Sequence, residues 1–90
     1  MTAEDREAIR RQAGAALAEI LGLPIAHVTA TPIVFDLPGF DSVAAVALLE
    51  RLEGEFQVEV PAEAIVPEAF ESLDALAELF ARPLQAVERR

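Results

Sequence analysis

Three stretches of this 90-residue chain repeat apolar residues every three or four positions, and glycine or proline follows each of them. The first stretch has its apolar residues at Ile9, Ala13, Ala16, Leu17, Ile20 and Leu21. This spacing predicts an amphipathic helix over about residues 3–21, which Gly22 and Pro24 end. A chain this short with such a pattern is limited to a small helical bundle around one core.

The same periodicity predicts two further helices. One begins at Asp41 or Ser42 and runs to about residue 55, because Asp and Ser both favour the N-cap position. The last spans about residues 68 or 72 to 81, where Pro83 limits it, although residues 84–87 could restart a turn. The core side of the second helix is predicted to hold Ala45, Leu48, Leu49, Leu52 and Phe56.

Residues 22–41 form a long connection with little helical periodicity. Its apolar residues are too many for a free linker, so we expect the segment to be pinned across the core. These residues are Leu23, Ile25, Val28, Ile33, Val34, Phe35 and Leu37. Thr31-Pro32 indicates a cap followed by a short helical turn over 33–35. Pro and Gly in the middle of 37–40 favour a type II turn.

Residues 56–60 alternate apolar and polar side chains, but Pro61 follows and no second strand is available to pair with them. We therefore interpret them as an extended connection, followed by a short helical segment over 62–66. The predicted fold is all-α, a small bundle of three main helices plus a short helix, with a long loop between the first and second helices. We expect one domain over 1–90, with its core at about 5–81 and a C-terminal tail at 82–90.

The composition removes most catalytic chemistry. Without cysteine there is no disulfide, thiolate nucleophile or cysteine zinc site, and His27 is the only histidine. We find no residue set that would make the chain an enzyme or hold a metal. The acidic start lacks a signal-peptide pattern, and no apolar run approaches membrane-spanning length. We expect a soluble, cytoplasmic monomer that does not insert into membranes.

Negative charge is concentrated in the middle of the chain. The net charge is −9, and residues 36–78 contain eleven acids against one base, Arg51. Such a field repels nucleic acid and attracts basic protein surfaces. Alternatively, the acidity serves only to keep a small domain in solution.

Ser42 lies where the long loop meets the second helix. The residues around it lack the small-residue pattern of a nucleophile elbow, so a hydrolase nucleophile is disfavoured. Either Asp41 or Ser42 is expected to cap the helix, which leaves room for a serine displayed to carry an attached group. Ser72 begins the last helix in a similar way, and we interpret it as an N-cap or a solvated residue.

The outward side of the second helix combines small apolar residues with acids. It is predicted to hold Val43, Ala47, Glu50 and Gly54, with Val46 and Glu53 at its border. A small apolar patch ringed by acids is typical of a docking surface, although isolated exposed apolar residues are also ordinary.

Several short motifs in this order resemble the acyl carrier protein family over about residues 5–81. They are Ile20-Leu21-Gly22, Val28-Thr29, Asp36-Leu37, Asp41-Ser42-Val43, Leu52-Glu53-Gly54-Glu55-Phe56, Val58-Glu59-Val60-Pro61 and Ser72-Leu73. Each is weak alone, and their order and spacing together are specific.

The resemblance implies that Ser42 is the attachment point of a 4′-phosphopantetheine arm, installed from coenzyme A by a phosphopantetheinyl transferase. The arm's thiol would hold an acyl or aminoacyl group as a thioester. Asp41 would help to position the transferase or its metal-bound coenzyme A. Basic partner enzymes, including a loading ligase or transferase, would recognise Val43, Val46, Ala47, Glu50 and Glu53.

The resemblance also implies an interior that admits a short acyl chain or is simply core, lined by Leu48, Leu49, Phe56, Ile65 and Phe70. Three features depart from the family pattern: Val43 replaces leucine, residues 37–40 are one residue longer than the common link, and Ala44 and Ala47 replace acids. They favour a discrete carrier of a specialised pathway over one of primary fatty acid synthesis. The alternative is an unmodified acidic adaptor that docks basic partners and tolerates Ser42→Ala.

Overall fold

Helix α1 spans Ala3–Leu21 in the computed structural model, which describes residues 3–88. The helix ends as predicted, because Gly22 adopts the left-handed conformation with φ of +68°. The N–H of Gly22 donates to the carbonyl of Glu19, and the N–H of Leu23 donates to that of Ala18 at 2.9 Å. This bond pair satisfies carbonyls that the last turn would otherwise leave open.

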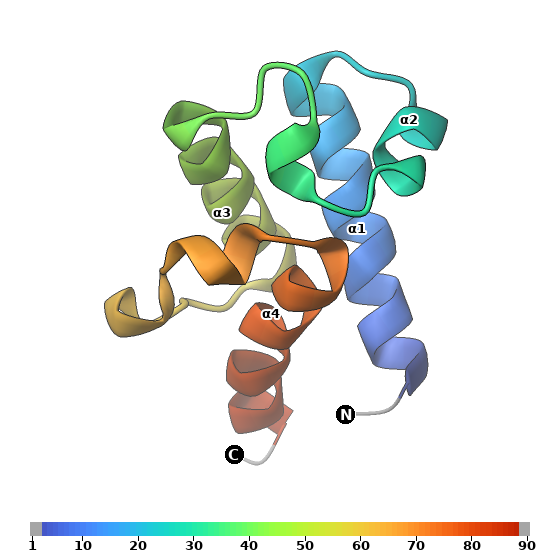
Figure 1. Cartoon of the computed structure of the whole chain (residues 1–90). Coiled ribbons are helices and arrows are strands. Elements are labelled where there is room, and N and C mark those ends of the chain that lie inside the picture. The colour runs from blue at the N-terminus through green and yellow to red at the C-terminus, as the bar shows by residue number, and fades with distance from the viewer. Residues whose placement is uncertain (1–2, 89–90) are drawn as a thin grey trace.

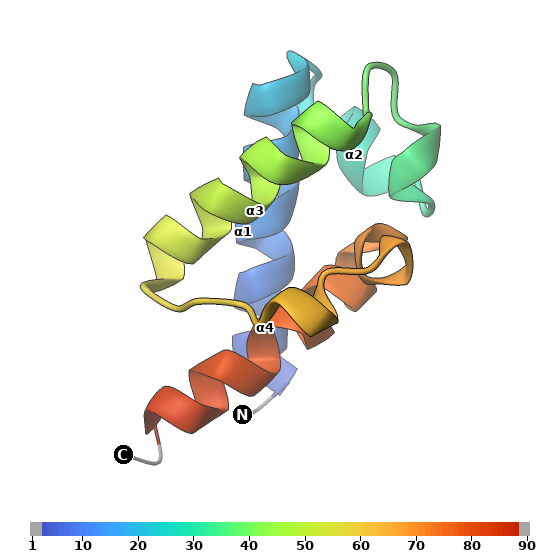
Figure 2. The same ribbon diagram turned by 90° about the vertical axis from the view of Figure 1, so that its left-hand side faces the viewer.

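Helices α3 (Ser42–Phe56) and α4 (Leu73–Glu88) both pack against α1 (Figure 1). In both views α1 begins and α4 ends at one end of the molecule, and α3 begins toward the other end (Figure 2). Residues 3–88 contain no β-strand. The predicted all-α bundle of three main helices is therefore confirmed.

The core joins one apolar stripe from each main helix. From α1 it takes Ile9, Ala13, Ala16 and Leu17; from α3 Leu48, Leu49 and Leu52; and from α4 Leu76, Ala77, Leu79 and Phe80. Ala45 and Phe56, also predicted for the core side of α3, are only half-buried, and the ring of Phe56 contacts that of Phe80 at a centroid distance of 5.6 Å. Burial of these stripes is the main force that holds the helices together.

The long connection contains a short helix that the sequence analysis missed, α2 (Ile25–Ala30). Its single buried residue is Val28, so it has no repeating apolar pattern to detect. The predicted role of Thr31 was also wrong. Its hydroxyl donates to the carbonyl of His27 at 2.8 Å and so closes α2 instead of capping the next turn. That next turn, η1, covers Val34–Asp36.

The connection is pinned across the core, as expected, but by only some of its apolar residues. Val28, Val34 and Leu37 are buried, whereas Ile25, Ile33 and Phe35 are each about half exposed. The N–H of Val34 also donates to the carbonyl of Glu71 at 2.9 Å, which ties the connection to the segment before α4.

The turn over 37–40 agrees with the predicted type II geometry. Gly39 has φ of +84°, and the N–H of Phe40 donates to the carbonyl of Leu37 at 3.1 Å. The turn delivers the chain to the start of α3.

Two 3₁₀ turns, η2 (Ala62–Ala64) and η3 (Pro67–Phe70), link α3 to α4. Between α3 and η2 the chain has a turn at Gln57 and then no regular helix or strand, so residues 56–60 do not form a strand. Gln57 ends α3 in the left-handed conformation with φ of 55°, and the N–H of Val58 donates to the carbonyl of Glu53. This arrangement closes α3 in the way that Gly22 closes α1.

Helix α4 continues through Pro83 to Glu88, so the predicted end at residue 81 was wrong. Proline removes one backbone donor and crowds the preceding turn, which normally ends or bends a helix. Here Leu84, just beyond the proline, packs against the core, and this contact favours continuing the helix. The expected tail thus belongs to α4 as far as Glu88, and residues 89–90 lie outside the described residues.

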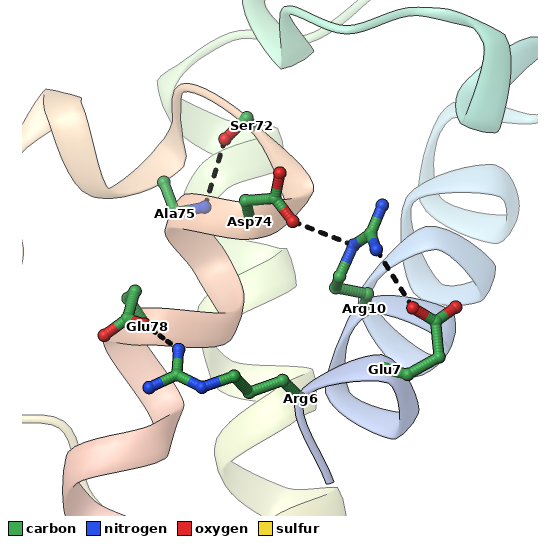
Figure 3. A network of polar contacts seen from close by, with 7 residues as sticks. All are labelled: Arg6, Glu7, Arg10, Ser72, Asp74, Ala75 and Glu78. Atoms are coloured by element: carbon green, nitrogen blue, oxygen red, sulfur yellow. Dashed lines mark hydrogen bonds and ion pairs between the residues drawn. The ribbon is translucent and has the colours of Figure 1, made fainter. Parts of the chain in front are cut away.

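Ion pairs join the outer surfaces of α1 and α4 (Figure 3). Arg6 pairs with Glu78, and Nε of Arg10 lies 3.0 Å from Oδ1 of Asp74. All four side chains are substantially exposed, so each pair adds at most about 1 kcal/mol to stability. The buried apolar stripes, rather than these pairs, hold the two helices together.

Two glycines provide a matched test of backbone conformation. A Cβ built on Gly22 or Gly54 meets no atom within 4 Å apart from its chain neighbours and the helix's own backbone, but only Gly22 has positive φ. We expect Gly54→Ala, inside α3, to stabilise the fold by about 0.5–1 kcal/mol. We expect Gly22→Ala to destabilise it by about 1–2 kcal/mol. Urea unfolding of both variants beside the parent chain measures these changes, and two shifts of the same sign would contradict the assigned conformations.

Candidate functional site

Asp41 caps the start of α3. Its backbone is extended, and its Oδ1 accepts a hydrogen bond of 2.9 Å from the N–H of Ala44. Its carbonyl accepts the first intrahelical bond, also 2.9 Å, from the N–H of Ala45. Of the two residues predicted as possible caps, Asp41 therefore has this role.

Ser42 is the first residue of α3, and its side chain is exposed. Because Asp41 accepts the capping bond, the hydroxyl of Ser42 is not needed to close the helix. A group attached at this position would begin beside the first-turn N–H groups and the positive end of the helix dipole, which favour a phosphate. The local structure thus fits a phosphate-linked group on Ser42.

The approach to Ser42 is held by apolar contacts. The ring of Phe40 packs edge-to-face on that of Phe35, with centroids 5.4 Å apart and planes at 75°. Phe40 is half-buried, and Leu37 is buried in the core. The sequence analysis did not predict this aromatic pair, because Phe35 and Phe40 lie on opposite sides of a turn.

The outer side of α3 next to Ser42 is apolar and exposed. Val43 is 75% exposed and Val46 is 54% exposed. Ala47 is half-buried, and Glu50 is exposed one turn after Val46. Val43 and Glu50 are thus exposed on the outward face that the helical spacing predicts, and Val46, predicted at its border, is exposed beside them. Whether partners bind there remains a prediction.

Glu53 differs from the other residues predicted for this face. Its Oε2 accepts a 2.8 Å hydrogen bond from the N–H of Val60 in a partly buried setting. The carboxylate therefore fastens the chain after α3 to the helix. This intramolecular role could not be predicted from the sequence. Val60 lies seven residues after Glu53, and the two come together only because the chain turns back at the end of α3.

Arg51, the single base among residues 36–78, is held by two carboxylates. It pairs with Glu19 of α1, and its Nε donates to Oε1 of Glu55 at 3.3 Å. Hydrogen bonds to Glu19 and Glu55 raise the pKa of the guanidinium above its ordinary value. Because neighbouring carboxylates match this charge, the outer side of α3 keeps an acidic character.

Ser72, the other serine of the chain, has the predicted capping role. Its Oγ accepts a 3.0 Å hydrogen bond from the N–H of Ala75 at the start of α4, and its side chain is half-buried. The two serines therefore have different settings, one displayed and one engaged.

The residues predicted to line the interior do not all lie there. Leu48, Leu49 and Phe70 are buried in the core and Phe56 is half-buried, whereas Ile65 is 41% exposed. Ile65 follows the short turn η2, which faces solvent and has no buried residue. The interior assignment of Ile65 was therefore wrong.

Two further features bear on function. In the part of the chain that the structure describes, no cluster of three or more His, Cys, Asp or Glu side chains is arranged to hold a metal ion. None of the described helices is long and apolar enough to cross a membrane.

A family model described as a phosphopantetheine attachment site matches residues 12–80, which is most of the chain. The matched range contains Asp41, the whole of α3 and both serines. No curated protein and no solved structure matches the chain.

The assignment of the caps can be tested by three alanine variants. We expect Asp41→Ala and Ser72→Ala each to lower the free energy of unfolding by about 1 kcal/mol, because each removes a capping acceptor. Ser42→Ala should change it by less than about 0.5 kcal/mol, since its exposed hydroxyl caps nothing. Urea unfolding measures all three, and a loss at Ser42 equal to that at Asp41 would contradict the assignment.

Proposed function

The chain belongs to the phosphopantetheine attachment family, and we propose that it carries an acyl or aminoacyl group as a thioester on a 4′-phosphopantetheine arm linked to Ser42. The observation that carries this proposal is the contrast between the two serines of the chain. Ser42 is exposed at the start of α3, whereas Ser72 is half-buried and accepts the capping bond of α4. The Ser42 hydroxyl is the one available for modification.

Asp41 supports the modification of Ser42 in two ways. Through Oδ1 it fixes the first turn of α3, so that the adjacent serine is presented in a defined position. Its Oδ2 atom is not part of that bond, and we assign it to the transferase or to the metal ion that accompanies coenzyme A. Both roles need the carboxylate at this position.

When bound, the arm supplies a thiol that this cysteine-free chain lacks. The chain's own contribution is to hold the attachment point at the end of a rigid helix and to leave it open to solvent. The apolar contacts of Phe35, Phe40 and Leu37 hold the approach to that point. An enzyme can therefore reach the hydroxyl without displacing any part of the core.

The partners of this site are a phosphopantetheinyl transferase and the enzymes that load and use the carried group. Val43 and Val46 offer an apolar contact, with Ala47 beside them. Glu50 supplies a negative charge one turn further on. Such a surface fits enzymes with basic docking sites around an apolar centre. Glu53 would contribute mainly by holding Val60 in place.

The details of this face favour a specialised pathway. Val43 follows the serine where the family pattern has leucine. Ala44 and Ala47 are found where carriers of primary fatty acid synthesis often have acids. Ala44 is buried, so an acid there would be costly without a partner. A less charged first turn selects partners by apolar contact more than by charge. Candidate pathways include polyketide, modified lipid and surface polysaccharide assembly, and aminoacyl transfer.

The modification is tested by intact mass after incubation with coenzyme A, magnesium and a promiscuous phosphopantetheinyl transferase. We expect the parent chain and Ser72→Ala to gain one phosphopantetheine each, and Ser42→Ala to gain none. Ser72→Ala is a matched control, because it removes the only other serine. Circular dichroism checks that all three proteins are folded.

Folded parent protein that gains no mass with several transferases would overturn the proposal. It would favour the alternative function, an unmodified acidic adaptor that needs the outer side of α3 but not the Ser42 hydroxyl. A gain of one phosphopantetheine by Ser42→Ala would show that the protein is a carrier with its attachment point at another residue, and would contradict the assignment to Ser42.

A further inference from the structure

A groove separate from the Ser42 site lies between α4 and the segment of residues 57–69, and we call it the α4 groove. It is open to solvent and has a volume of about 960 Å³. Figure 1 shows this segment projecting to one side of α4. No residue of α3 lines the groove. It is therefore distinct from the face that carries Val43 and Val46.

The floor of the α4 groove is apolar and hollowed by small side chains. Val58 and Leu79 contribute buried side chains from its two walls. Ala64, Ala69 and Ala75 are half-buried. Because alanine side chains end at Cβ, they leave room above the floor for the side chains of another molecule. Such a surface suits apolar side chains from a partner.

The rim on the segment side is acidic. Glu59, Glu63 and Glu68 line the groove with exposed side chains, and within residues 3–88 none of them forms an ion pair. Glu78 on the α4 side is already paired with Arg6. Arg82 also lines the groove from α4, so three unpaired carboxylates face one exposed base, and the lining still attracts cationic ligands more than anionic ones.

The groove is formed before any partner binds. The segment wall is fastened at one end by the 2.8 Å bond from the N–H of Val60 to the carboxylate of Glu53, and Phe70 is buried at the other end. In between, the N–H of Ala64 donates to the carbonyl of Pro61 at 2.9 Å. A preformed groove lowers the cost of ordering on binding.

We propose that the α4 groove binds a basic amphipathic segment of a partner protein, as a second docking surface independent of Ser42. The apolar side chains of that segment fill the hollow above Ala69 and Ala75. Its Lys or Arg side chains contact Glu59, Glu63 and Glu68. This is the helix-in-groove mode of peptide recognition with charge added at the rim. A partner bound there leaves the first turn of α3 open to a second enzyme.

The test is a titration of the ¹⁵N-labelled full chain with a short amphipathic peptide of leucine, alanine and lysine. We expect amide shifts at Val58, Ala64, Ala69, Ala75 and Leu79 that exceed those at Val43 and Val46, because the acidic outer side of α3 attracts the peptide only weakly; larger shifts at Val43 and Val46 would contradict the proposal. The same peptide with glutamate in place of lysine should not bind. Shifts confined to the outer side of α3, or equal binding of the two peptides, would overturn the proposal.

Charge reversals separate a specific groove from general acidity. Glu63→Lys, on the groove rim, should weaken binding of the lysine peptide roughly threefold to tenfold. Glu50→Lys, the same change on α3, should leave the affinity within about twofold, since it alters only long-range charge. Equal weakening by both variants would show non-specific attraction and contradict the proposal.

Ala75→Leu tests the floor by filling the hollow without changing charge. It should abolish the shifts while the circular dichroism spectrum stays that of the parent chain, and unchanged binding by this folded variant would overturn the proposal. Ser42→Ala should bind the peptide as the parent chain does. Peptide binding therefore tests the groove and the gain in intact mass tests the modification of Ser42, so that either proposal can be contradicted without the other.

Discussion

The presentation of Ser42 depends on the anchoring of the long connection before α3. Val34 and Leu37 are buried, and the N–H of Val34 donates to the carbonyl of Glu71, which immediately precedes the cap of α4. These contacts tie the connection to the core and to the residues just before α4. Without these contacts the position of the 37–40 turn would not be fixed. The start of α3, which follows this turn, would then not be held in one position either. A surface serine is thus held by core interactions made several residues before it.

The polar side chains at the start of α3 and along it have different structural roles. Asp41 accepts the capping bond, which leaves the adjacent hydroxyl exposed. Arg51 is paired with Glu19 and Glu55, so that the outer side of α3 stays acidic. Glu53 holds Val60 and thereby shapes the segment that follows α3. The result is a helix that displays one serine at its start, while its carboxylates provide internal ties and negative charge.

The parts of the fold with a long apolar period could be predicted from the sequence, and the parts set by contacts between distant residues could not. The apolar pattern of α1 and the stripe of α3 specify helices whose bounds agree closely with the structure. Helix α2 was missed because one buried residue, Val28, makes no pattern. The continuation past Pro83 depends on where Leu84 meets the core, and the capping choice between Asp41 and Ser42 depends on backbone geometry. Ser42 could be proposed as the attachment point because few chemical groups compete with it, whereas the bond from Val60 to Glu53 exists only in the folded chain.

The central claim is that the hydroxyl presented by the Asp41-capped turn is the attachment point of the arm. The most direct measurement is tandem mass spectrometry of peptides from the unmutated protein after conversion with coenzyme A and a transferase. The account predicts that every fragment bearing phosphopantetheine contains Ser42 and that the fragments containing Ser72 are unmodified. An arm located on Ser72 or on any other residue would contradict it.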